Sequence, residues 1–233
     1  MGTGARSYMN IEALAELGIQ VYLIKNYGDT AVAECAFGLM WACARNLTFM
    51  DRAMRQGQWQ RSEGVQLTGK TIGLIGFGGI GAEMARMCLG AGLRVLAWNR
   101  SPRNVPSVTF LPLEQVLAQS DVISLHLLLD DSTKGFITGE RLNQIKAGAI
   151  LLNTARGALI DELALVESLK SGHIRQAGLD VFTVEPLPID HPFLKLDNIT
   201  LSAHSAFRVP EANQRLVDLA INVTVNIFVR KSK

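Results

Sequence analysis

Three polar side chains in the second half of the chain are of types that could together carry acid–base chemistry. Arg156, Glu185 and His204 each lie just past an apolar run that predicts a buried strand. A histidine titrates near neutral pH, and a carboxylate behind it orients the ring, so Glu185 and His204 could form an acid–base pair. The guanidinium of Arg156 suits a substrate carboxylate, because its fork donates two parallel hydrogen bonds. Single histidines and arginines in loops are more often structural, so this interpretation depends on the rest of the chain.

A glycine-rich segment in the middle of the chain matches a phosphate-binding pattern. Residues 76–81 form a G-x-G-x-x-G sequence that follows a predicted strand and opens a predicted helix. The first glycine allows a tight turn, the second lets the backbone approach a pyrophosphate, and the third permits close packing of helix on strand. The helix N-terminus adds free N–H groups and a partial positive charge. The segment predicts a dinucleotide site that uses Gly76, Gly78, Gly79, Ile80 and Gly81.

The end of the next strand bears on which dinucleotide binds. An NAD site usually has an acidic residue about 20 positions on, whereas an NADP site replaces it and supplies an arginine for the 2′-phosphate. Here the strand is followed by Asn99, Arg100 and Ser101, with no carboxylate. This favours NADP(H) over NAD(H). In the alternative, Arg100 is a solvated residue near the adenine and Asn99 serves NAD.

The elements around these residues alternate regularly. Apolar runs predict strands at 71–75, 94–98, 121–125, 149–152, 177–180 and 199–201, and helical patterns lie between them at 80–89, 113–117, 140–145 and 161–170. The strands are nearly continuous apolar runs, as burial on both faces requires. The predicted fold is α/β, a doubly wound parallel sheet of the Rossmann type with flanking N- and C-terminal helices.

The two ends of the chain follow a different pattern. A helix at 11–17 and a strand at 20–23 precede a long apolar helix at 30–47, which runs on to residue 54 with or without a break. A polar connection covers 57–69, and a last helix begins near Pro210. These observations divide the chain into a short N-terminal remnant, a helix and connection, a dinucleotide-binding domain and a C-terminal helix, at residues 1–28, 29–69, 70–208 and 209–233.

Composition excludes several classes of protein. The chain has 233 residues, 48% hydrophobic and 19% charged, with a formal net charge of +2. The small net charge argues against nucleic acid as a partner, and the apolar content argues against disorder. We expect no export signal, membrane span or metal site, because the chain shows none of the corresponding patterns. Three cysteines without paired spacing, Cys35, Cys43 and Cys88, indicate reduced core residues in a cytoplasmic protein.

Four segments together resemble the D-isomer-specific 2-hydroxyacid dehydrogenases, a family that includes glyoxylate/hydroxypyruvate reductases, phosphoglycerate dehydrogenases and the C-terminal-binding corepressors. The segments are the glycine-rich stretch 67–81, Leu-Asn-Thr-Ala-Arg-Gly at 152–157, Gly-Leu-Asp-Val-Phe-Thr-Val-Glu-Pro-Leu-Pro at 178–188, and Ser-Ala-His at 202–204. Their order and spacing are highly specific, with 29 residues from Arg156 to Glu185 and 19 from Glu185 to His204. The resemblance covers nearly the whole chain.

The resemblance implies a role for each matching residue. Arg156 looks like the arginine that binds the 2-oxo and carboxylate oxygens, His204 like the general acid for keto-acid reduction, and Glu185 like its partner. It also implies that the cofactor is contacted by Thr154, Ala155, Arg156, Asp180 and His204, with Asp180 at the nicotinamide carboxamide. His126 falls in the segment that passes the adenosine half of the cofactor, and it is expected to be structural or adjacent to the cofactor, not catalytic. His173 and His191 match no functional position and are expected to be exposed.

The N-terminus departs from the family pattern. Members normally carry about a hundred residues of a substrate domain ahead of the dinucleotide domain, at the short end of domain sizes. Of that domain, this sequence resembles only the last unit, and most determinants of which 2-hydroxy acid binds belong to the rest of it. We expect the chain to bind NADP or NAD and to reduce glyoxylate or hydroxypyruvate slowly or not at all. The alternative is a corepressor-like dimer that senses the cofactor without turnover. In either case the 30–47 helix suggests a homodimer.

Overall fold

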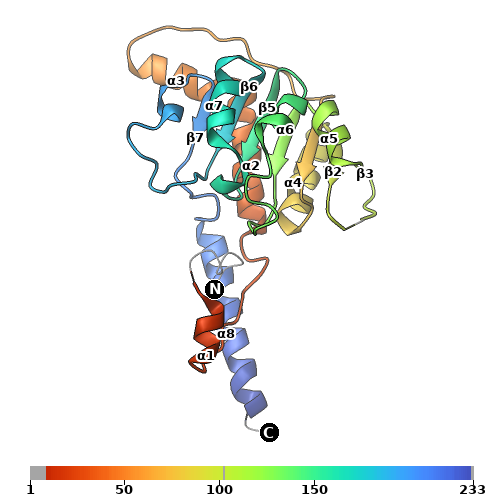
Figure 1. Ribbon diagram of the computed structural model, residues 1–233, viewed down its shortest axis with the longest axis vertical. Helices are drawn as coiled ribbons and strands as arrows, with labels where there is room; N and C mark the ends of the chain where they lie inside the picture. Colours follow the sequence, from red (N-terminus) through yellow and green to blue (C-terminus); the bar gives the residue numbers. More distant parts are fainter. Residues whose placement is uncertain (1–8, 102, 232–233) are drawn as a thin grey trace.

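A seven-stranded parallel sheet forms the centre of the molecule (Figure 1). The computed structural model describes residues 9–101 and 103–231, with the side chains of the last helix as far as Ile227. Its strands are β1 (Thr71–Ile75), β2 (Arg94–Trp98), β3 (Val108–Phe110), β4 (Val122–Leu125), β5 (Ala149–Asn153), β6 (Ile174–Leu179) and β7 (Ile199–Leu201). Their order is β3-β2-β1-β4-β5-β6-β7. Strands β2 and β3 are added on one side of β1, and β4 to β7 on the other. The strand order therefore reverses between β1 and β4, and ligands of such sheets bind at this switch point.

Helices cover both faces of the sheet. The helices α2 (Asp29–Ala44) and α4 (Gly79–Gly90) pack on one face, and α5 (Leu113–Gln119), α6 (Gly139–Gln144) and α7 (Glu162–Lys170) pack on the other. Strand β5 shows the consequence, because Leu151 belongs to the core beneath α5–α7 whereas Ile150 and Leu152 belong to the core beneath α2 and α4. Apolar side chains are needed at every position of such a strand. The predicted doubly wound sheet is confirmed.

The long apolar helix of the N-terminal third is broken in two. Helix α2 ends at Ala44, and α3 (Leu47–Arg55) begins after Asn46, which has a left-handed backbone with φ 51°. The Asn46 amide donates to Ser62 Oγ (2.7 Å) and to the Glu63 carbonyl (2.8 Å), and its oxygen accepts from Gln176 Nε2 (2.7 Å). One side chain therefore ties the break to the following connection and to β6.

Two details of the predicted elements are wrong. Residues 20–23 form no strand, because no described segment pairs with them. Strand β3, at the sheet edge, was not expected from the sequence. It is only three residues long, and its Thr109 is exposed, so it lacks the continuous apolar run that marks the central strands.

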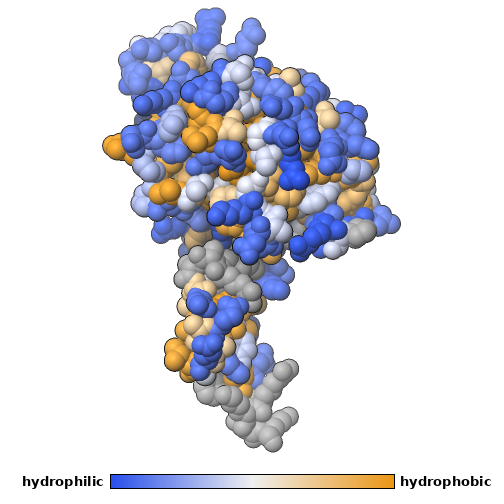
Figure 2. Space-filling model, in the orientation of Figure 1, coloured by the Kyte–Doolittle hydropathy of each residue, from blue (hydrophilic) through white to orange (hydrophobic). Residues whose placement is uncertain are grey.

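Two helices project from one end of the sheet domain. They are α1 (Ile11–Glu16) and α8 (Pro210–Lys231), and Figure 1 shows both below the sheet. Apolar side chains are exposed along them, with Leu17 at 75% and Ile221 at 56% exposed, and Figure 2 shows apolar atoms scattered over this projecting part. The expected substrate-domain segment at residues 2–6 lies outside the described residues. Among the residues described, no helix is long and apolar enough to cross a membrane.

Candidate active site

The glycine loop between β1 and α4 is shaped as its pattern predicts. Gly76 has φ +95°, and a Cβ there would lie 2.6 Å from the His126 carbonyl oxygen. A Cβ on Gly81 would lie 2.6 Å from the Gly76 oxygen, so helix α4 packs too closely on the strand for any side chain. At Gly78, by contrast, nothing lies within 4 Å. The open side of the loop at the start of α4 can therefore admit a pyrophosphate.

The segment after β2 is tied to this loop. Asn99 Oδ1 accepts a hydrogen bond from the Phe77 backbone N–H (3.1 Å), and Asn99 Nδ2 donates to the Ser101 carbonyl (2.9 Å). Arg100 and Ser101 are exposed beside it. The amide at position 99 therefore supports the glycine loop, and Arg100 is an exposed cation next to it in the chain.

Two further side chains flank the glycine loop. The Asp29 carboxylate, at the start of α2, occupies the space where a Cβ on Gly79 would point, and burial raises the pKa of Asp29, as does the charge of Glu83. His126 lies behind Gly76 and its Nε2 is 3.0 Å from Ser124 Oγ. Burial lowers the pKa of His126 to about 4, so the ring is neutral at physiological pH. This fits the structural role expected for His126 next to the loop.

The turn that carries Arg156 is held by the last residue of β5. Asn153 is buried, its Oδ1 accepts from the Ala155 N–H (3.0 Å), and its Nδ2 donates to the Arg156 carbonyl (2.8 Å). Arg156 itself is partly buried and donates from Nη1 to the Ala155 carbonyl (2.7 Å). The buried Thr154 hydroxyl has no hydrogen-bond partner among the described residues. Since buried polar atoms are normally satisfied, this hydroxyl points to a ligand in the turn.

Asp180 lies at the end of β6 and is fully buried. Its Oδ1 accepts from Ser202 Oγ (2.5 Å) and the Ser205 N–H (3.0 Å), and its Oδ2 accepts from the Ala206 N–H (2.9 Å). The His204 N–H donates to the Asp180 carbonyl (2.7 Å), and His204 has a left-handed backbone with φ 47°. Asp180 thus holds the turn that presents His204, and its expected contact with a nicotinamide carboxamide stays a prediction.

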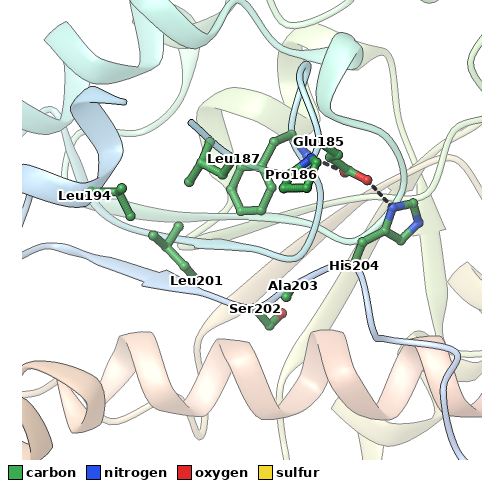
Figure 3. Close-up of a pocket in the computed structure, with 9 residues that line it drawn as sticks. Glu185, Pro186, Leu187, Leu194, Leu201, Ser202, Ala203 and His204 are labelled. Carbon is green, nitrogen blue, oxygen red and sulfur yellow. Dashed lines mark hydrogen bonds and ion pairs between the residues drawn. The ribbon is translucent and has the colours of Figure 1, made fainter. Parts of the chain in front are cut away.

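Glu185 and His204 are brought together. Glu185 Oε2 lies 2.5 Å from His204 Nδ1, and Glu185 Oε1 accepts from the Phe182 N–H (2.9 Å). Figure 3 shows the carboxylate pointing at the imidazole at one end of a cavity of about 580 Å³, with apolar side chains at the other end. With Nδ1–H donating to the carboxylate, Nε2 is the ring nitrogen free to face a substrate. The side chains of His204 and Glu185 are 38% and 33% exposed, so solvent reaches the pair.

Asp29 carried no sequence signal, and only its contact with the glycine loop places it at the site. Asn153 belongs to the quoted 152–157 segment, but its role in holding the Arg156 turn is revealed only by its contacts. The expectation that His173 and His191 are exposed is wrong. His173 is partly buried with Nε2 3.0 Å from the Leu142 carbonyl, and the His191 side chain is only 19% exposed.

A parallel doubly wound sheet with a glycine loop at its switch point is the fold of a dinucleotide-binding protein, and a Glu–His acid–base pair lies beyond β6 and β7 of the same sheet. Residues 37–206 match the model of the D-isomer specific 2-hydroxyacid dehydrogenase, NAD binding domain. The chain belongs to this family.

Named relatives agree with this assignment. The chain is 39% identical to a hydroxypyruvate reductase of Thermotoga maritima over 89% of this chain and 70% of that protein. Among solved structures, a glyoxylate reductase from Paecilomyes thermophila superposes with a TM-score of 0.88 at 34% identity, over 95% of this chain and 68% of the other. An acyclic imino acid reductase in complex with NADPH and D-Arg superposes with a TM-score of 0.86 at 33% identity, over 94% of this chain and 72% of that one.

Proposed function

We propose that this protein transfers hydride between a nicotinamide cofactor and a small 2-oxo or 2-hydroxy acid, with His204 as the general acid for reduction. The observation that carries the proposal is the 2.5 Å contact between Glu185 and His204 Nδ1 at one end of an apolar cavity. The contact leaves Nε2 to hold a proton next to a substrate carbonyl. Arg156 is the group proposed to bind the substrate carboxylate and its 2-oxo oxygen.

The residues fit a nicotinamide dinucleotide. The open side of Gly78 and the start of α4 would receive the pyrophosphate, and the unpartnered Thr154 hydroxyl and Ala155 would lie at the nicotinamide. When bound, the cofactor supplies or accepts the hydride. The protein contributes the rest: Arg156 orients the acid, Glu185 orients the imidazole, and His204 donates the proton to the developing alkoxide oxygen.

Turnover by this chain is proposed to be slow, because solvent reaches the acid–base pair and water exclusion strengthens such sites. The test is a spectrophotometric assay of nicotinamide oxidation with glyoxylate and with hydroxypyruvate, comparing the purified chain with His204→Asn. If His204→Asn has the same activity as the wild-type chain, His204 is not the general acid. Fast turnover by the wild-type chain would instead refute the proposed slow rate.

The cofactor preference is proposed to be NADP(H). Exposed Arg100 supports it, as does the absence of a carboxylate at positions 99–101. Fluorescence titration should give a lower dissociation constant for NADPH than for NADH, and Arg100→Ala should weaken NADPH binding about tenfold with little effect on NADH. Equal weakening of both cofactors would place Arg100 away from the 2′-phosphate.

Oligomeric state, domain limits and location are also proposals. We propose a homodimer, which exposed Leu47, Met54 and Trp59 on α3 and the segment after it support. The chain mass is 25.4 kDa, so a species of about 25 kDa by light scattering would contradict the dimer. We retain residues 70–208 as the dinucleotide-binding domain, flanked by 1–28, 29–69 and 209–233. The free cysteines support a cytoplasmic location.

A further inference from the structure

A second carboxylate contacts the loop that carries Glu185. Glu162, in the first turn of α7, accepts a hydrogen bond at Oε1 from the Thr183 N–H (2.8 Å). The preceding N–H, that of Phe182, donates to Glu185 Oε1 (2.9 Å). Two successive backbone N–H groups are therefore each held by a glutamate, one from α7 and one from the acid–base pair itself. The Glu162 side chain is 18% exposed, whereas Thr183 is exposed.

The other oxygen of Glu162 faces a histidine from the far side of the same loop. Its Oε2 lies 3.6 Å from His191 Nε2. His191 Nδ1 accepts from the Phe193 N–H (3.3 Å), and the two rings pack with centroids 4.6 Å apart. With Nδ1 accepting, the neutral ring carries its proton on Nε2 and turns it toward Glu162. Glu162 thus bridges two points of the 183–191 loop, on either side of Glu185.

The same peptide is closed in from a third side by the turn that carries Arg156. A Cβ on Gly157 would lie 1.9 Å from the Phe182 carbonyl carbon and 2.3 Å from the Thr183 nitrogen. The peptide between Phe182 and Thr183 is therefore packed against the residue after Arg156, with Glu162 as its hydrogen-bond acceptor. The position of this peptide sets where the 183–191 loop starts. It therefore sets where Glu185 lies and how the loop packs against the Arg156 turn.

We propose that Glu162 is a positioning residue for the acid–base pair. It fixes the Phe182–Thr183 peptide, and through that peptide it keeps the Glu185 carboxylate on His204 Nδ1. This rests on the proposed function in that the pair is taken to be the proton donor. Loss of the Glu162 contact frees the Thr183 N–H, loosens the loop on both sides of Glu185, and removes the cause of the Nδ1–H tautomer of His204.

The test is the tautomer of His204, read from long-range ¹H–¹⁵N correlations of its ring in the purified chain at alkaline pH, with no cofactor or substrate. His204→Asn assigns the signals. The variants are Glu162→Asp, which keeps the charge at the start of α7 but shortens the reach, and Glu162→Ala. Both should lower the Nδ1–H share of His204 by at least about half, because an unheld ring loses its fixed tautomer. Glu162→Gln keeps a carbonyl for the Thr183 N–H and should retain most of the signal.

The matched control is Glu167→Ala on the same helix, which removes an exposed carboxylate that pairs with Lys170 at 2.9 Å and should leave His204 unchanged. The proposal would be overturned if Glu162→Asp had the same Nδ1–H share of His204 as the wild type. It would also be overturned if Glu167→Ala lowered that share as much as the Glu162 variants do. If Glu162→Ala fails to fold, Glu162→Asp and Glu162→Gln still separate the outcomes. The tautomer is measured without turnover. An inactive wild-type chain would therefore count against the proposed function, but the role of Glu162 would still be tested.

Discussion

The glycine loop and the acid–base pair lie beyond the carboxyl ends of strands in one sheet, but they are held in different ways. The glycine loop is a continuous stretch whose shape comes from backbone packing, with no room for a Cβ at Gly76 or Gly81. The acid–base pair is assembled from separate loops after β6 and β7, and side-chain carboxylates join them. Asp180 holds the His204 turn, and Glu185 joins that turn to the loop after β6.

This difference predicts how each region responds to substitution. A loop fixed by backbone contacts tolerates changes of charge but not added volume. Turns fixed by buried carboxylates tolerate little change in those carboxylates, because each leaves unsatisfied N–H groups behind when it is removed. The four predictions below test this contrast, in order of decreasing effect.

The largest effect is expected at Asp180. Replacing it with alanine removes the acceptor for two backbone N–H groups and the Ser202 hydroxyl in a fully buried position, and should lower the free energy of unfolding by about 3 kcal/mol. Urea unfolding measures it. The control is Asp197→Ala, whose carboxylate is 81% exposed and paired with Arg52 at 3.2 Å, and which should change stability by less than about 0.5 kcal/mol. Similar losses in both variants would show that Asp180 has no special role.

The second effect is a pH dependence at His126, behind the glycine loop. Its pKa is lowered to about 4 in the folded protein, against about 6.5 when the chain is unfolded. As the pH falls from about 6.5 to 4, His126 becomes protonated in the unfolded chain but stays neutral in the folded chain. The free energy of unfolding therefore decreases over this range. This group should account for a loss on the order of 2 kcal/mol over that range.

The variant His126→Asn isolates this contribution. Its free energy of unfolding should fall less steeply between pH 6.5 and 4 than that of the wild type, by the same amount of about 2 kcal/mol. A constant offset between the two proteins reflects only the lost contact with Ser124 Oγ. Parallel pH curves would mean that the ring is not kept neutral behind the loop.

How far the sequence predicts the molecule follows the same contrast. The strands β1, β2 and β7 have the predicted bounds. All of β1 is buried, whereas β2 begins with exposed Arg94 and is marked by the apolar residues that follow it. The glycine loop was predicted from a local pattern of glycines, although the residues packed against it, such as Asn99 and His126, are distant in sequence. The pairing of Glu185 with His204 was anticipated from their residue types, but the Asp180 contacts were not, because Asp180 and the Ala206 N–H are 26 residues apart and meet only when β6 and β7 pair. A family resemblance supplied roles for Glu185 and His204, but nothing in the sequence pointed to Glu162.

The third prediction concerns Gly78, which has open space beside it. Its backbone, with φ −85°, is one that alanine can adopt. Gly78→Ala should therefore leave the unfolding midpoint unchanged or slightly raised. The same methyl group would occupy the side of the loop proposed to receive the pyrophosphate, so cofactor binding should weaken at least about tenfold. Gly90→Ala, at the other end of α4 and also with nothing within 4 Å, is the matched control. Fluorescence titration that gives one dissociation constant for all three proteins would place the cofactor elsewhere.

The smallest effect is expected at Asp29, whose carboxylate lies against Gly79 of the glycine loop. Its pKa is raised, chiefly by burial, so the folded protein holds the charged form of Asp29 less favourably than water does. Asp29→Asn keeps the shape and removes the charge, and should tighten dinucleotide binding about two- to threefold at neutral pH, with a smaller gain at high salt. Glu167→Gln on the opposite face of the sheet is the control for net charge. Weaker binding by Asp29→Asn would mean that the carboxylate supports the loop, and that the phosphate end, like the acid–base end, depends on a buried acid.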